Sequence, residues 1–308
     1  MQRVSLAISL ASAIVLSTAL AARAADERIA VVTPYLSAVT TAEMVEAFQN
    51  EAAAKGWSVD VVDTAGDMGA FAGRVEDATT TGVDAIVLVS VDPAQIQDQV
   101  DKAKAAGIPV ITIDGAKNDA TVLNVTSDNY VLGETMTTFL FDQLGGEGNI
   151  VRFFHSAHPG VRQREIALDD ALAKTPGIKE VDNHYVQVPG QIDDSRAAMD
   201  AMLLAHPGKG AIDAVWAAWD EPGIGAELAT EAAGRTDIVI AGIDANPQAV
   251  ELIKACTNYI ATVRQGFPQM AEIAAGELEK LFAGETLDQQ GLYAPVDLVT
   301  RESLGVTC

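Results

Sequence analysis

Two aspartates, Asp114 and Asp244, each follow directly on a short apolar run, PVITI and VIAGI. Such runs are typical of the buried strands of a parallel sheet, and ligands bind beyond the carboxyl ends of those strands. A carboxylate there can accept hydrogen bonds from neighbouring hydroxyl groups, or can serve as one of the paired acids of a glycosidase. A further alternative is that each aspartate caps the helix after its strand.

Other motifs give weaker chemical signals. His155 and His158 are spaced as two metal ligands could be, but no cysteine or third histidine lies nearby, so we expect a polar loop and no metal site. The segment GIGAEL at 223–228 lacks the third glycine of a dinucleotide fingerprint and is better interpreted as a helix start packed closely on a sheet. The chain contains no Walker loop, GxSxG or HExxH motif. We therefore expect no cofactor and no catalytic residues.

The segments 82–115 and 211–245 have the same order of signals: an apolar strand, an acid followed by proline, a helix, a glycine, and a second strand that ends in aspartate. The chain therefore looks like two similar α/β halves, one containing Asp114 and the other Asp244. If the strand ends of the two halves face each other, they form a cleft. Lobes that move about a hinge suit a glycosidase poorly, because its carboxylates need a fixed separation.

Short apolar strands alternate with amphipathic helices along the chain, which predicts two doubly wound parallel sheets. No linker rich in Gly, Ser or Pro divides the halves, so ordered crossings near Ser127, Gln265 and Ala294 should act as a hinge. Besides the two strands and the helix of 211–245, we expect strands at 28–33, 57–63, 85–90, 109–114, 149–154, 179–187, 259–264 and 295–300, and helices at 40–55, 71–81, 93–106, 130–144, 160–174, 193–205 and 269–282.

Residues 1–25 have the form of a cleaved export signal, with Arg3, an apolar run from Val4 to Leu20, and an Ala-Arg-Ala cleavage sequence. We therefore expect a soluble periplasmic protein. The chain carries 43 acidic and 20 basic residues, a formal net charge of −23, and loss of the signal makes this charge two units more negative. Such a balance argues against nucleic acid and anionic membranes as partners.

Cys256 and Cys308 are the two cysteines of the chain, and they have no CxxC spacing. An oxidising compartment permits a disulfide, although the sequence does not show that the two residues meet. Since both lie at the ends of segments in the second half, we expect them to be joined.

The mature chain resembles the sugar-binding branch of the type I periplasmic binding proteins, of which ribose-binding proteins are members. The resemblance covers residues 27–303. The segments that carry it are, in chain order, IAVVTP at 29–34, PVITIDG at 109–115, SDN at 127–129, RQR at 162–164, LAHP at 204–207, WDE at 219–221, VIAGID at 239–244 and ATVRQ at 261–265.

The resemblance implies an α/β fold of two lobes joined by a hinge, with residues 26–127 and 265–293 in the N-terminal lobe and residues 128–264 and 294–308 in the C-terminal lobe. It also implies ligand contacts from five matching positions, Asp114, Arg164, Trp219, Asp244 and Gln265. Arg162 and Arg164 lie about 200° apart on a helix, so only one can face the cleft, and the match favours Arg164. The alternatives are a surface ion pair for Arg164 and a core role for Trp219.

The chain departs from the ribose-binding pattern at several of these positions. Thr40 and Thr41 stand where ribose binders have two phenylalanines, Gly115 stands where they have an arginine, and Trp219 replaces an asparagine. We expect Trp219, with Tyr35 or Phe154, to provide an apolar wall against the C–H face of a ligand. We include Tyr35, Thr40 and Thr41 among the expected ligand-binding residues.

These features together predict a monomeric, non-enzymatic solute-binding protein of an ABC importer, which binds a monosaccharide or related polyol and delivers it to a membrane permease. One alternative is a chemoreceptor or signalling adaptor that uses the same lobe closure. The other is a secreted carbohydrate-active enzyme.

Overall fold

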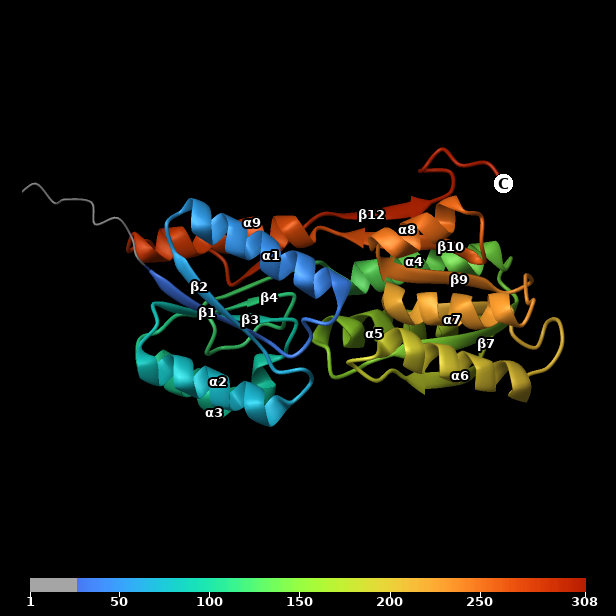
Figure 1. The fold of residues 1–308 in the computed structure, drawn as a ribbon. Coiled ribbons are helices and arrows are strands. Elements are labelled where there is room, and N and C mark those ends of the chain that lie inside the picture. Colours follow the sequence, from blue (N-terminus) through green and yellow to red (C-terminus); the bar gives the residue numbers. More distant parts are fainter. Residues whose placement is uncertain (1–26) are drawn as a thin grey trace, which may run out of the picture.

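The computed structural model describes residues 27–308, so the expected export signal lies outside the described residues. Within 27–308 the chain forms two six-stranded sheets, which lie in two lobes along the long axis of the molecule (Figure 1). The first sheet has the order β11-β5-β4-β3-β1-β2 and the second β12-β10-β9-β8-β6-β7. The strands are β1 (Arg28–Thr33), β2 (Ser58–Asp63), β3 (Ala85–Val89), β4 (Val110–Ile113), β5 (Leu123–Thr126), β6 (Gly148–Phe154), β7 (Ile178–Tyr185), β8 (Ala214–Ala217), β9 (Val239–Asp244), β10 (Tyr259–Gln265), β11 (Gly291–Tyr293) and β12 (Val296–Thr300).

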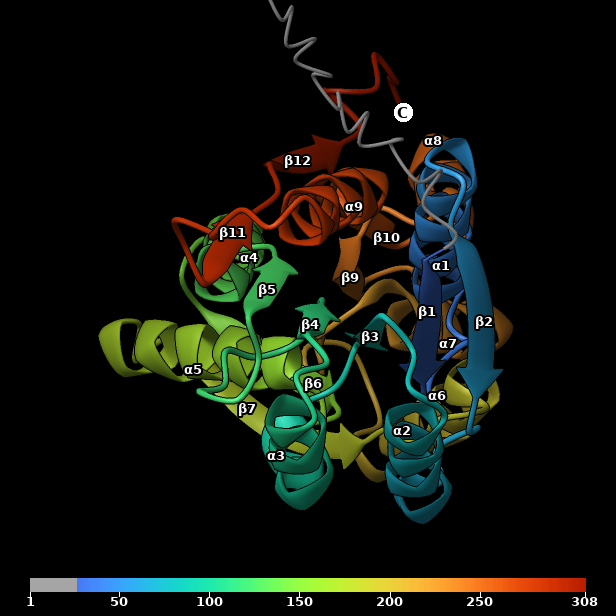
Figure 2. The ribbon, with the colours of Figure 1, turned by 90° about the vertical axis from the view of Figure 1, so that its left-hand side faces the viewer.

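Helices cover both faces of the first sheet (Figure 2). One face packs on α1 and α9 through Met44, Phe48 and Met270, and the other packs on α2 and α3 through Phe71 and Val100. The central strand β3, with the sequence AIVLV, is therefore buried along its whole length. The helices of the chain are α1 (Val39–Ala54), α2 (Met68–Thr81), the 3-10 turn η1 (Pro93–Ile96), α3 (Gln97–Ala105), α4 (Asn129–Gln143), α5 (Pro159–Lys174), α6 (Gln191–Ala205), α7 (Asp220–Ala232), α8 (Pro247–Lys254) and α9 (Phe267–Phe282).

The prediction of two α/β sheets with flanking helices is confirmed. Three short elements were not predicted: β5, α8 and β11. These segments have three to eight residues, too few for a hydrophobic period to be recognised. The expected helix 93–106 is divided into η1 and α3. No helix within residues 27–308 has the length and apolar character that crossing a membrane requires.

The last strand, β12, runs antiparallel to β10, whereas the neighbouring pairs in the sheet are parallel. Its direction follows from the path of the chain. After β11 in the first sheet the chain returns to the second sheet at Val296, which lies opposite Gln265 at the end of β10. A strand that starts beside the end of its neighbour must run the opposite way.

Cys256 and Cys308 form a disulfide with a Cα–Cα distance of 5.9 Å, which confirms the expected pairing. Cys256 follows α8, and Cys308 is the last residue of the chain, so the bond fixes the segment after β12 to the second lobe.

Replacing both cysteines with serine is expected to lower the free energy of unfolding by about 2–4 kcal/mol, since the bond closes a loop between residues 52 positions apart. Urea denaturation of the double variant, beside the wild type with and without reductant, measures this loss. Equal midpoints for the three samples would contradict it.

Candidate functional site

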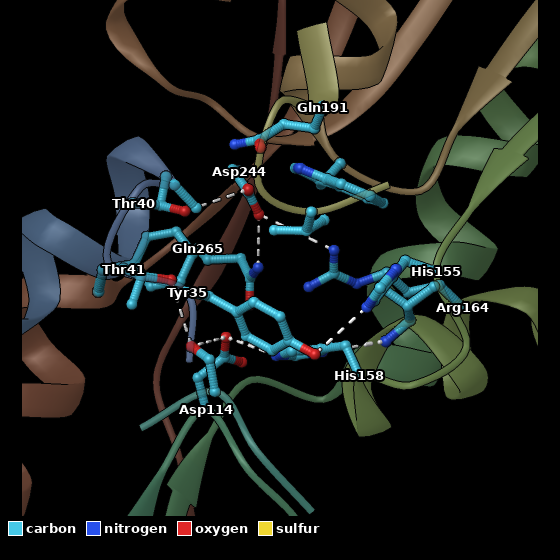
Figure 3. Close-up of a pocket in the computed structure, with 16 residues that line it drawn as sticks. Tyr35, Thr40, Thr41, Asp114, His155, His158, Arg164, Gln191, Asp244 and Gln265 are labelled. Carbon is cyan, nitrogen blue, oxygen red and sulfur yellow. Dashed lines mark hydrogen bonds and ion pairs between the residues drawn. The ribbon is translucent and has the colours of Figure 1, made fainter. Parts of the chain in front are cut away.

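A cavity lies where the carboxyl ends of the two sheets meet, between the two lobes (Figure 3). The space open to the centres of water molecules inside it is about 60 Å³, several times the ~10–15 Å³ that one water needs. All eight residues expected from the sequence lie in its wall: Tyr35, Thr40, Thr41, Asp114, Arg164, Trp219, Asp244 and Gln265. Phe154 is not among the lining residues and packs edge-on against Tyr185.

Asp244 ends β9 in a left-handed backbone conformation with φ 126°, and its side chain is buried. Its carboxylate accepts a hydrogen bond from Gln265 Nε2 at 2.7 Å and one from Thr40 Oγ1 at 3.4 Å. Burial raises the pKa of Asp244, while the positive charge of Arg164 opposes this rise. The helix after β9 is capped by Asn246, whose Oδ1 accepts from Ala249 N, so the capping role considered for Asp244 is wrong.

Arg164 lies on α5 and is only 2% exposed, which excludes a surface ion pair. Its Nε donates to Asn129 Oδ1 at 2.9 Å and its Nη1 to the carbonyl oxygen of Ala218 at 2.6 Å. Nη1 also lies 3.9 Å from Asp244 Oδ1. Gly133 on α4 allows this packing, because a Cβ there would lie 2.7 Å from the Cα of Arg164. The guanidinium is therefore fixed beside Asp244 by its own lobe.

Arg162 lies outside the cavity wall, in agreement with the expectation that only one of the two arginines faces the cleft. Its guanidinium nevertheless forms an ion pair through Nη2 with Asp92. Asp92 lies between β3 and η1 on the first lobe. Arg162 therefore connects the two lobes at the edge of the cleft.

Asp114 follows β4 with φ 54° and is buried. Ser90 Oγ and Thr126 Oγ1 lie 3.4 and 3.5 Å from its carboxylate. The next element after it is the strand β5, so the helix-capping alternative is wrong here as well. Its carboxylate is open to the cavity from the first lobe, while Asp244 faces the cavity from the second (Figure 3).

Trp219 is 9% exposed; it packs on the core of the second lobe and also lines the cavity. Val161, Val188 and Phe267 extend this apolar wall. Thr40 and Thr41 are buried in the wall on the side of α1. The cavity thus has an apolar part formed by Trp219, Phe267 and two valines, and threonine hydroxyls on the side of α1.

His155 and His158, which we expected in a polar loop, also line the cavity. His155 Nδ1 lies 2.9 Å from the carbonyl oxygen of Val186, to which it must donate, and burial lowers the pKa of His155. Its Nε2 is therefore an acceptor for the hydroxyl of Tyr35 at 3.2 Å. Burial raises the pKa of Tyr35 to about 12, so this hydroxyl keeps its proton.

His158 has the opposite tautomer. Its Nδ1 accepts from the backbone N–H groups of Gly160 and Val161 and caps α5, so the proton lies on Nε2, 3.3 Å from Asp114 Oδ2. A histidine directly before proline at a helix start was the sequence signal for this cap. Among residues 27–308 no group of His, Cys, Asp and Glu side chains is arranged to hold a metal ion.

Several contacts join the lobes around the cavity and show that the structure is closed. Tyr35 contacts His155, and Asp114 contacts His158. At the start of α1, Val39 N donates to Glu221 Oε1 at 3.1 Å. The Arg162–Asp92 ion pair also joins the lobes, but neither of its residues lines the cavity.

Comparison with known proteins places the chain among binding proteins. Residues 29–286 match the family described as "Periplasmic binding protein domain". The ribose import binding protein RbsB of Bacillus subtilis is 29% identical, over 82% of this chain and 81% of its own length. The xylitol-binding protein of Mycolicibacterium smegmatis is also 29% identical, over 78% of this chain and 68% of its own. A solved structure of an ABC transporter solute-binding protein from Agrobacterium vitis with bound allitol superposes with a TM-score of 0.86 at 28% identity, and covers 91% of this chain and 97% of that one.

Proposed function

Because the chain belongs to the periplasmic binding protein domain family, we propose that it is a solute-binding protein of an ABC transporter. It binds a monosaccharide or related polyol in the cavity between its lobes. The observation that carries this proposal is the polar set around Asp114, Arg164 and Asp244, which two lobes contribute to one closed cavity. Carboxylates accept hydrogen bonds from hydroxyl groups and a guanidinium donates them, so this set suits a neutral, hydroxyl-rich solute.

Each residue of the set has a proposed role. Asp114, Asp244 and the Gln265 side chain hydrogen-bond ligand hydroxyls, and Arg164 donates to ligand oxygens. Thr40, Thr41 and Tyr35 supply further hydroxyls on the side of the first lobe. Trp219 packs against the C–H groups of the ligand, since an aromatic ring gives such contact at a small entropy cost.

The mechanism is hinge closure without chemistry on the ligand. The N-terminal lobe comprises residues 26–127 and 265–293, and the C-terminal lobe comprises 128–264 and 294–308. The chain passes from one sheet to the other after β5, after β10 and after β11. A ligand that contacts both lobes favours the closed state, because it gains part of its binding free energy only there. The protein acts in the periplasm as a monomer, and a membrane permease recognises its closed form.

Ribose, xylitol and allitol, the solutes named for similar proteins, are suitable probes. We expect at least one to bind by titration calorimetry, and a saturating amount of it to reduce the radius of gyration measured by X-ray scattering. The ligand recovered after long incubation should be chemically unchanged.

Binding without any change in scattering would contradict hinge closure. Recovery of a converted product would instead support the enzyme alternative. Stabilisation by amino acids and by none of a wide set of sugars and alcohols would overturn the class of ligand.

A further inference from the structure

Two amide oxygens in the cavity wall have no hydrogen-bond partner among the residues that the structure describes, Gln191 Oε1 and Gln265 Oε1. Both side chains are buried, with exposed fractions of 5% and 4%. A buried acceptor without a donor costs about 1–3 kcal/mol, and such groups are normally paired in folded proteins. Gln265 was expected from the sequence as a ligand-binding residue, whereas Gln191 was not.

The orientation of each amide follows from the carboxyl group beside its nitrogen. Gln265 Nε2 donates to Asp244 Oδ1 at 2.7 Å, which leaves Oε1 as the free end. Burial raises the pKa of Glu221, while the side chain of Gln191, which lies beside it at the start of α6, lowers this pKa. A carboxyl oxygen attracts the N–H end of an amide, so the oxygen of Gln191 is the end that faces away from Glu221. Figure 3 shows this oxygen turned toward Asp244.

Acceptors are prominent in the cavity wall, while several of its donors already bond within it: Thr40 Oγ1 donates to Asp244 and Ser90 Oγ to Asp114. Besides the two amide oxygens, Asp114 and Asp244 present carboxylates to the cavity. Arg164 is the strongest donor, but it already donates through Nε and Nη1 to groups of its own lobe. The histidines add little donor capacity, because His155 Nε2 is an acceptor and the Nε2 proton of His158 faces Asp114.

This balance distinguishes between two kinds of hydroxyl-rich ligand. Every oxygen of an acyclic sugar alcohol is a hydroxyl that can donate a proton. The cyclic form of the corresponding aldose has one hydroxyl fewer and a ring oxygen that only accepts. On the side of α1 the wall presents Thr40 and Thr41, which offer no flat ring to stack on a sugar ring.

We propose that Gln191 is a ligand-binding and specificity-determining residue, whose Oε1 accepts a ligand hydroxyl and thereby favours an acyclic sugar alcohol over the cyclic aldose of the same carbon number. This proposal rests on the proposed function. A site with a buried acceptor discriminates against a ligand that leaves it unpaired, and the stated cost corresponds to about five-fold to more than a hundred-fold in affinity.

The test compares matched ligand pairs, xylitol with xylose, ribitol with ribose and allitol with allose, by titration calorimetry. For at least one pair the wild type should bind the alcohol at least ten-fold more tightly than the aldose. Gln191→Met, which removes both polar atoms at a similar volume, should weaken alcohol binding at least ten-fold and reduce the alcohol-to-aldose ratio. Gln187→Met is the matched control, because Gln187 is exposed and lies outside the cavity wall, and it should leave both affinities within two-fold of the wild type.

The outcomes separate this proposal from the proposed function. If the wild type binds the aldoses as tightly as the alcohols, the proposal is overturned and the proposed function stands; this comparison needs no variant to fold. If Gln191→Met weakens both members of a pair equally, Gln191 has a structural role only and the proposal is again overturned. If no member of any pair binds, both the proposed function and the proposal fail.

Discussion

Replacing Arg164 with alanine is expected to weaken ligand binding at least about a hundred-fold. The change removes a buried cation and leaves Asn129 Oδ1 and the carbonyl oxygen of Ala218 without their donor. It also removes the positive charge 3.9 Å from Asp244 and the N–H groups proposed to bind ligand oxygens. Hydrogen bonds to charged groups contribute about 1.5–3 kcal/mol each, so the loss of two gives an effect of this size. Titration with the tightest-binding probe among ribose, xylitol and allitol measures it.

The control for this change is Arg196→Ala, which removes an exposed arginine on α6 outside the cavity. Its affinity should match that of the wild type. Arg162 is not a neutral control, because its ion pair with Asp92 connects the lobes. An Arg164→Ala protein that folds, as judged by circular dichroism, and binds like the wild type would refute the proposed site.

Gly242→Ala is expected to destabilise the protein by more than about 3 kcal/mol, near the upper end of overpacking effects. Gly242 lies in β9, where an added Cβ would come within 2.1 Å of Tyr259 Oη and 2.7 Å of Asp220 Oδ1. These two atoms are 2.8 Å apart in a hydrogen bond, and Asp220 also accepts from Thr262 Oγ1 and Asn246 N, both at 2.7 Å. Because the whole group is buried, the methyl group can be accommodated only if this network breaks.

Gly276→Ala is the matched control for this prediction. Gly276 lies in α9, and an added Cβ there would meet no atom within 4 Å. Alanine is the better helix former by about 1 kcal/mol, so this variant should be as stable as the wild type or more stable. Urea denaturation compares the three proteins, and a Gly242→Ala protein with the midpoint of the wild type would show that the strand can move aside.

Several features of the fold and site could be predicted from the sequence because they depend on local patterns. Apolar runs that end in aspartate placed Asp114 and Asp244 at strand ends, and these strands form as expected. The choice of Arg164 over Arg162 came from the family resemblance, while helical geometry said only that the two side chains point apart. The roles of these residues in ligand binding remain proposals.

Other features depend on segments that meet only in the folded chain. Gln191 stands at the start of a helix without a motif of its own, and it reaches the cavity because α6 begins beside Glu221 of α7. His155 and His158 face Tyr35 and Asp114 only because the two lobes close. Strand β11 has only three residues. It forms because it pairs with β5, which lies far from it in the sequence.

Strands β11 and β12 determine when, during synthesis of the chain, the edges of the two sheets can be covered. β11 covers β5 at the edge of the first sheet, and β12 covers β10 at the edge of the second. Both therefore come from the last part of the chain, residues 291–300. A chain cut or still unfinished before Gly291 would present β5 and β10 as two open strand edges, each a template for pairing with another chain. Truncation before this one segment should thus leave the inner strands β5 and β10 at the sheet edges and make the chain more prone to aggregate, although most of its sequence is intact.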